Sequence, residues 1–143
     1  MTQKLLVVLA SLAVAAPAVA ATGEHTVKEH VDLTLVKRTG TTKLEHKGRA
    51  TGTVKGTVTS KITISHSVVM RGTVTISARD GKVRLKVDGR ARSIGARSNF
   101  NGTATMSGGT GKYAGATGTG TFKGVVNRRT WHVTLDATGS YHY

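Results

Sequence analysis

Cysteine is absent from all 143 residues, and proline occurs once, at Pro17. The lack of cysteine excludes disulfides, thiol chemistry and cysteine-based metal sites. Aromatic residues make up only 4% of the chain. These are too few to interleave with cations as a stacking platform for single strands, so nucleic acid is not expected as a specific partner. Without cross-links, stability must come from pairing and packing, which favours a sheet without open edges.

Acidic residues are also scarce, with seven Asp and Glu against 21 Lys and Arg, giving a formal net charge of +14. Such an excess draws a protein towards anionic surfaces. For an exported protein these include anionic cell-envelope polymers and lipid head groups. The alternative is a solvated cationic face that only keeps the protein soluble. Composition leaves both readings open.

The longest apolar run, residues 5–16, is too short to span a bilayer and follows a short opening that contains Lys4. Pro17 and the small residues Ala18 and Ala20 come next, as at a signal-peptidase site. We therefore expect a cleaved signal peptide over residues 1–21 and one domain over 22–143. The mature protein would have no transmembrane span and would be secreted or held in the envelope or periplasm.

From Leu44 to Ala78, small or apolar residues alternate with Thr, Ser, Lys and Arg. Only a β-strand places every second side chain on one face, so the pattern predicts a sheet with one apolar and one cationic face. An outer-membrane barrel would show the reverse arrangement with aromatic girdles, so a barrel with its charges outside is favoured. The side chains expected to face anions are Lys47, Arg49, Lys55, Arg84, Lys86, Arg90 and Arg92.

The alternation divides into about eight strands, because strands usually run three to ten residues. Asp80-Gly81 predicts a two-residue type I′ hairpin turn, and the apolar phase flips there as such a turn requires. Residues 59–61 are one further candidate turn and residues 66–70 another. The predicted fold class is all-β, a single antiparallel barrel. Its expected strands are residues 25–37, 42–51, 57–65, 70–79, 82–92, 100–106, 117–125 and 130–142.

Residues 108–118, GGTGKYAGATG, break the alternation and predict a compact turn. A phosphate loop would lead from a strand into a helix, whereas strand follows here. The motif resembles the glycine-rich turn of allene oxide cyclase and dirigent-like barrels. It is also similar to small exported bacterial proteins of unknown function that share a GGTGxYAGA turn. The resemblance implies an eight-stranded barrel with a cavity, which in plant members holds a hydrophobic molecule. Barrels of this family are often oligomeric, so this protein could form a homo-oligomer.

From their positions in the alternating pattern, we expect several polar and aromatic side chains to face the interior. Glu29, His46 and His66 are the candidate catalytic residues, since imidazoles and a buried carboxylate can act as acid and base. Tyr113, Trp131 and Tyr141 are candidate ligand-binding residues. The histidine spacing matches no compact metal motif, so we expect neither a metal site nor a cofactor.

Three functions remain open on the sequence. The leading hypothesis is a non-enzymatic exported barrel that binds an anionic polymer or a small apolar ligand. The alternative is a cyclase-like or dirigent-like isomerase or stereochemical guide, acting on a small hydrophobic substrate, which requires Glu29 and His46 or His66 to line one cavity. The third is a structural protein whose interior is filled.

Overall fold

The computed structural model of the protein describes residues 24–66 and 68–142. The predicted signal peptide therefore lies outside the described residues. A 3₁₀ helix, η1 (Gly111–Tyr113), separates the sixth and seventh strands. The strands are β1 (His25–Thr39), β2 (Lys43–Gly52), β3 (Gly56–Ser65), β4 (Val69–Ala78), β5 (Gly81–Ala91), β6 (Arg97–Gly109), β7 (Thr117–Asn127) and β8 (His132–His142).

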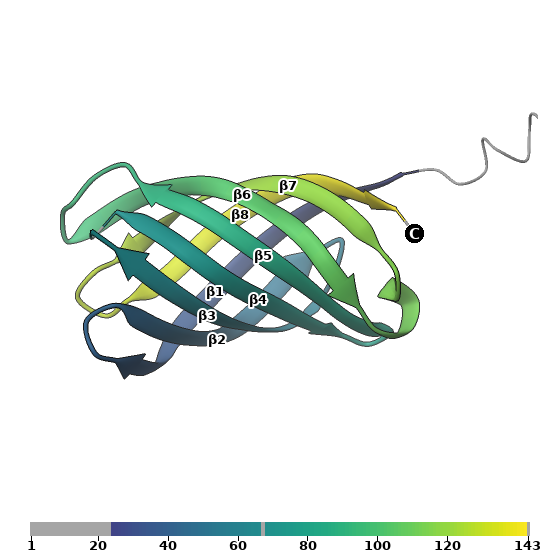
Figure 1. The fold of residues 1–143 in the computed structure, drawn as a ribbon, viewed down its shortest axis with the longest axis horizontal. Helices are drawn as coiled ribbons and strands as arrows, with labels where there is room; N and C mark the ends of the chain where they lie inside the picture. The colour runs from purple at the N-terminus through teal and green to yellow at the C-terminus, as the bar shows by residue number, and fades with distance from the viewer. Residues whose placement is uncertain (1–23, 67, 143) are drawn as a thin grey trace, which may run out of the picture.

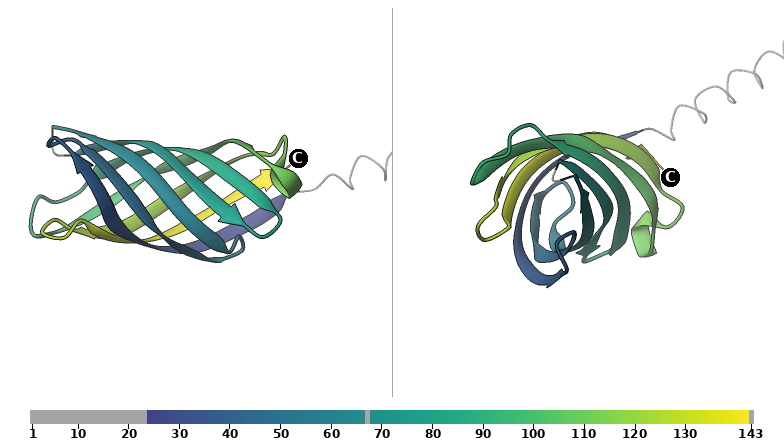
Figure 2. Two further views of the ribbon diagram at one scale, coloured as in Figure 1. Left: turned by 90° about the horizontal axis from the view of Figure 1, so that it is seen from below. Right: turned by 60° about the vertical axis from the view of Figure 1, so that its left-hand side comes forward.

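Each strand pairs antiparallel with the next, and β8 pairs with β1, which closes the barrel. Figure 1 shows the strands wrapping obliquely around the long axis, and Figure 2 shows the ring that they form. The predicted all-β, eight-stranded antiparallel barrel is confirmed. Closure leaves none of these eight strands with an unpaired edge, which suits a chain without disulfides.

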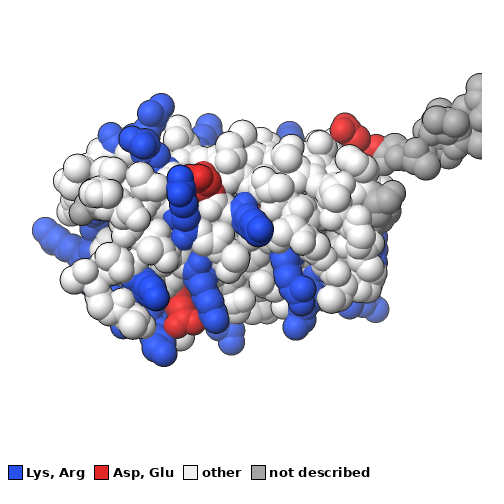
Figure 3. Space-filling view, viewed as in Figure 1, with Lys and Arg blue, Asp and Glu red and all other residues white. Residues whose placement is uncertain are grey.

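The two faces of the sheet follow the predicted alternation. All seven cations expected on the outer face are exposed, and Figure 3 shows lysine and arginine spread over the visible surface of the barrel. The inward row supplies the core, which includes Val31, Leu33, Val58, Ile76 and Val83. The two-residue period of the strands thus places these seven cations outside and the aliphatic core inside.

Two turn predictions need correction. Ala78 pairs with Gly81, so the two residues of the β4–β5 loop are Arg79 and Asp80, and Asp80 does not have the positive φ of a type I′ turn. The loop length was right and its centre was wrong by one residue. Gly81 instead begins β5 with φ +151°, where a Cβ would lie 2.1 Å from the carbonyl oxygen of Thr110. The candidate turn at residues 59–61 is also wrong, because that segment lies inside β3.

The barrel has two different mouths (Figure 1). The first mouth, where β1 begins and β8 ends, also carries η1 and is closed by buried Val54, Tyr113 and Tyr141. The second mouth carries the β1–β2, β3–β4, β5–β6 and β7–β8 connections. Among the described residues there is no helix of the length and hydropathy needed to cross a membrane.

Candidate functional site: the interior of the barrel

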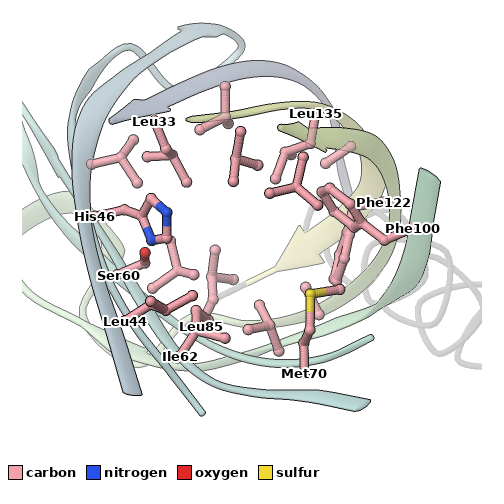
Figure 4. A pocket seen from close by; sticks show the side chains of 18 of the residues that line it. Leu33, Leu44, His46, Ser60, Ile62, Met70, Leu85, Phe100, Phe122 and Leu135 are labelled. Atoms are coloured by element: carbon pink, nitrogen blue, oxygen red, sulfur yellow. The ribbon is translucent and has the colours of Figure 1, made fainter. Parts of the chain in front are cut away.

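The barrel is hollow. A cavity of about 150 Å³ is lined almost entirely by aliphatic and aromatic side chains from all eight strands, and a smaller one of about 90 Å³ lies towards the first mouth. Figure 4 shows side chains such as Leu33, Leu135, Phe122 and Met70 arranged around the open space. The two cavities share Glu29, Ile76 and Leu85 among their walls. The third hypothesis, a filled interior, does not describe this barrel.

His46 is a polar group in this apolar wall. It lies on β2 and is 5% exposed, and its Nε2 is 2.7 Å from the carbonyl oxygen of Trp131. Burial lowers the pKa of His46 and the nearby His132 lowers it further, while the hydrogen bond to Trp131 raises it. The ring is therefore neutral at pH 7, with its proton on Nε2, because a carbonyl only accepts. This tautomer leaves Nδ1 as a hydrogen-bond acceptor.

Ser60 lies beside His46 in the same wall. The two residues face each other across β2 and β3, and their side chains lie side by side in Figure 4. Ser60 is 4% exposed, and its Oγ has no hydrogen-bond partner among the described residues. Ser60 is not among the site residues predicted from the sequence, because residues 59–61 were assigned to a candidate turn. Its position among the small or apolar residues of the alternating pattern was the signal in the sequence that indicated an inward side chain.

Glu29 is buried where the two cavities meet, with 8% of its surface exposed. Its Oε1 accepts a hydrogen bond from the amide of Val54, while Oε2 has no partner in the described part of the chain. A Cβ at Gly52 would come within 2.9 Å of Oε2, so glycine leaves the room that the carboxyl group occupies. Burial raises the pKa of Glu29, and the Val54 hydrogen bond opposes that rise.

Trp131 closes part of the second mouth. It adopts a φ of +59° in the connection before β8 and lines the larger cavity. The guanidinium groups of Arg38 and Arg128 lie 5.6 Å and 5.8 Å from its ring centre, within the range of cation–π attraction. Arg128 also donates through Nε to the Oγ of Ser98 at 2.7 Å. These contacts hold the indole at the cavity entrance.

The other two aromatic candidates lie at the first mouth. Tyr113 and Tyr141 are each 5% exposed, with ring centres 6.0 Å apart, and His25 stacks on Tyr141 at 5.0 Å. Tyr141 lines the smaller cavity. The three predicted ligand-binding aromatics are therefore split between the two ends of the barrel.

The inward placement predicted for His66 is wrong. β3 ends at Ser65, and His66 has a φ of +52° in the following turn, where its side chain is exposed. The alternation continues across this turn in the sequence, but the backbone leaves the sheet there. His66 consequently lies outside both cavities.

Glu29 and His46 share the larger cavity without being close to each other. His46 pairs with Leu35, six positions along β1 from Glu29, a separation of about 20 Å at 3.3 Å per residue. Proton transfer between the two would require hydrogen-bond distance or one bridging water. They therefore do not form an acid–base couple in this structure.

The outer face offers a different kind of surface. A depression of about 620 Å³ over β1, β2, β3 and β4 is lined mainly by exposed side chains. Lys37, Lys47 and Lys61 surround Thr59 and Thr73 there. Elsewhere on this face, Arg71 forms an ion pair with Asp88, and hydrogen bonds join His30 to Asp136 and His132 to Asp32. Across residues 24–66 and 68–142, no three His, Asp or Glu side chains gather as ligands of a metal ion.

Comparison with protein-family models finds no match, and comparison with curated proteins finds none either. Among solved structures, the chain is similar to a pterocarpan synthase dirigent protein, with 14% identity over 84% of this chain and 86% of that one. The TM-score is 0.34. A likeness this distant carries no argument about activity, and the barrel described above rests on its own strand pairing.

Proposed function

We propose that this chain is an exported binding protein that holds a small, largely apolar molecule inside its barrel. The observation that carries the proposal is the cavity of about 150 Å³, whose walls are aliphatic and aromatic apart from a few side chains. An apolar cavity of this size elsewhere is known to stay dry and to bind benzene. A ligand the size of one aromatic ring therefore fits the space without any change of the barrel.

The cavity also fits the general form of a ligand site. Such sites are mostly apolar, largely preformed and carry a small number of polar groups that fix orientation. Here the polar groups are His46, Ser60 and Glu29, all of them less than a tenth exposed. Export is supported by the composition of residues 1–21 and by a net charge carried on the outer face.

Trp131 is the chain's only tryptophan and lines the cavity, so its fluorescence reports on occupancy. We expect toluene to change this fluorescence saturably. Ala104→Phe, which projects a ring into the cavity, should abolish the change, whereas Thr105→Phe on the outer face of β6 should preserve it. Absence of saturable binding to the unmodified protein would remove the proposal.

The cationic exterior favours a second candidate function, association with an anionic envelope polymer. The exposed lysines around the depression over β1–β4 are the supporting observation. Such association weakens with salt, because exposed charges are screened beyond a Debye length of about 8 Å at 0.15 M. We expect Lys47→Gln combined with Lys61→Gln to reduce retention by anionic lipid vesicles, while Lys112→Gln near the first mouth does not. Retention that is unchanged at 1 M salt would argue against this role.

The isomerase alternative has less support from the geometry. Glu29 and His46 lie about 20 Å apart along the strands and His66 is exposed, so these three candidates do not bring an acid and a base together. A stereochemical guide needs only a shaped cavity, which the barrel does have. Conversion of a bound probe into an isomer by the protein, abolished by Ala104→Phe, would favour this alternative over binding alone.

A further inference from the structure

Two polar side chains lie together in the larger cavity, and each has hydrogen-bonding capacity that the described residues do not use. Ser60 is 4% exposed, and its Oγ has no hydrogen-bond partner within residues 24–66 and 68–142. His46 is 5% exposed and uses Nε2 for the carbonyl of Trp131. The two residues are directly opposite each other on β3 and β2, a placement in which Cβ atoms lie about 5 Å apart.

We infer that the ligand of the barrel is an uncharged molecule with a polar head that accepts a hydrogen bond from Ser60 and donates one to His46. This inference rests on the proposed function, since it specifies the chemistry of the molecule held in the same cavity. The head is an alcohol or an amide, and the rest of the molecule is apolar.

The hydrogen-bond chemistry of the pair selects this class. With its proton on Nε2, His46 presents Nδ1 as an acceptor, and the Ser60 hydroxyl donates or accepts. A carboxylate only accepts, so it has no hydrogen to offer to Nδ1. An ammonium only donates, and the nearest carboxyl group in the cavity wall, Glu29, is about 20 Å along the strands. An alcohol or an amide both donates and accepts.

The surroundings also disfavour an ionic head. Burying an unpaired ion in an apolar cavity is far more costly than burying a neutral group with its hydrogen bonds made. Arg128 is the cation in the wall of the larger cavity, and its guanidinium lies at the entrance, bonded to Ser98 and over Trp131. A neutral head beside Ser60 needs no counter-ion and satisfies a hydroxyl that is otherwise buried without a partner.

A matched set of one-ring probes tests the inference through the fluorescence of Trp131. Toluene, benzyl alcohol, benzamide, benzoate and benzylammonium differ mainly in the polar group. A hydrogen bond contributes about 0.5–1.5 kcal/mol. Ser60→Ala should therefore weaken benzyl alcohol and benzamide binding about three- to tenfold and leave toluene within about twofold. Ser65→Ala, the same change at an exposed position of β3, is the control and should alter none of them.

His46→Phe supplies a second variant, which keeps a ring in the wall and removes the acceptor. We expect it to weaken the same two probes and to spare toluene. If Ser60→Ala and His46→Phe leave benzyl alcohol and benzamide unchanged while toluene binds, the inference is overturned and the proposed function stands. Tighter binding of benzoate or benzylammonium than of the neutral probes would also overturn it. If toluene itself fails to bind, the proposed function falls, and the inference with it.

Discussion

Ser60→Ala should make the ligand-free protein more stable, which is the reverse of the usual effect of a core substitution. The Ser60 hydroxyl is buried at 4% exposure without a hydrogen-bond partner among the described residues. The transfer of this hydroxyl from water into the barrel therefore costs free energy that no hydrogen bond offsets. Alanine removes that hydroxyl and keeps the rest of the residue.

The expected size of the effect follows from two opposing contributions. A buried hydroxyl without a hydrogen bond costs about 1–3 kcal/mol in protein mutational data. The loss of one oxygen atom enlarges a cavity that already exists, so few packing contacts disappear. We expect a net gain of about 1 kcal/mol in the free energy of unfolding, or a rise of about 4 °C in Tm for a domain of this size.

Urea unfolding of the ligand-free protein measures this gain, and Ser98→Ala is its matched control. Ser98 is buried as well, at 0% exposure, but its Oγ accepts a hydrogen bond from Arg128 Nε at 2.7 Å and donates one to the carbonyl oxygen of Gly95 at 3.3 Å. Removing these bonds should destabilise the protein by about 1–2 kcal/mol. Destabilisation by Ser60→Ala of the same size as by Ser98→Ala would show that the Ser60 hydroxyl is satisfied, and the reasoning would be refuted.

Two further predictions follow from the barrel. Because burial raises the pKa of Glu29, the folded protein holds this proton to higher pH than the unfolded chain, and stability should fall as pH rises from 4.5 through the raised value. Glu29→Gln should remove that fall. Urea unfolding of both proteins at pH 5 and pH 8 measures the difference, and the same pH dependence of stability in the two proteins would contradict the prediction. Gly48→Ala should destabilise by more than about 3 kcal/mol, because a Cβ would lie 1.7 Å from the carbonyl oxygen of Asp32. Gly95→Ala, whose nearest neighbour would be at 3.6 Å, should change the Tm little, and equal effects of the two alanines would be inconsistent with the close pairing of β1 and β2.

The fold was predictable from the sequence because one physical constraint repeats along it. The alternation between Leu44 and Ala78 permits only strands, and eight such segments without cysteine favour a closed sheet. The turns were harder. At the β4–β5 loop the Asp-Gly pair suggested a type I′ turn, whereas the close approach of Gly81 to Thr110 fixes that glycine at the start of β5.

The candidate site was only partly predictable. The alternating pattern correctly predicted that Glu29 and His46 face the interior, because both lie within long strands. It misplaced His66, since alternation in the sequence continues through a turn in which the chain has left the sheet. The role proposed for Ser60 depends on the lack of a hydrogen-bond partner for its Oγ among the described residues. That lack results from three-dimensional packing, so the spacing of residues in the sequence cannot reveal it.

In a closed barrel, the backbone amide and carbonyl groups of the strands bond to neighbouring strands, so a molecule in the interior meets mainly side chains. In this chain nearly all of those side chains are apolar. The polar ones towards the second mouth are His46, Ser60 and Arg128, whose guanidinium already bonds to Ser98. For the ligand proposed above, a change at His46 or Ser60 should alter which polar head the cavity accepts, and no hydrogen bond between strands would be removed. On this proposal, ligand class and fold depend on different properties of the same strands, so ligand preference should be able to change while strand pairing stays the same.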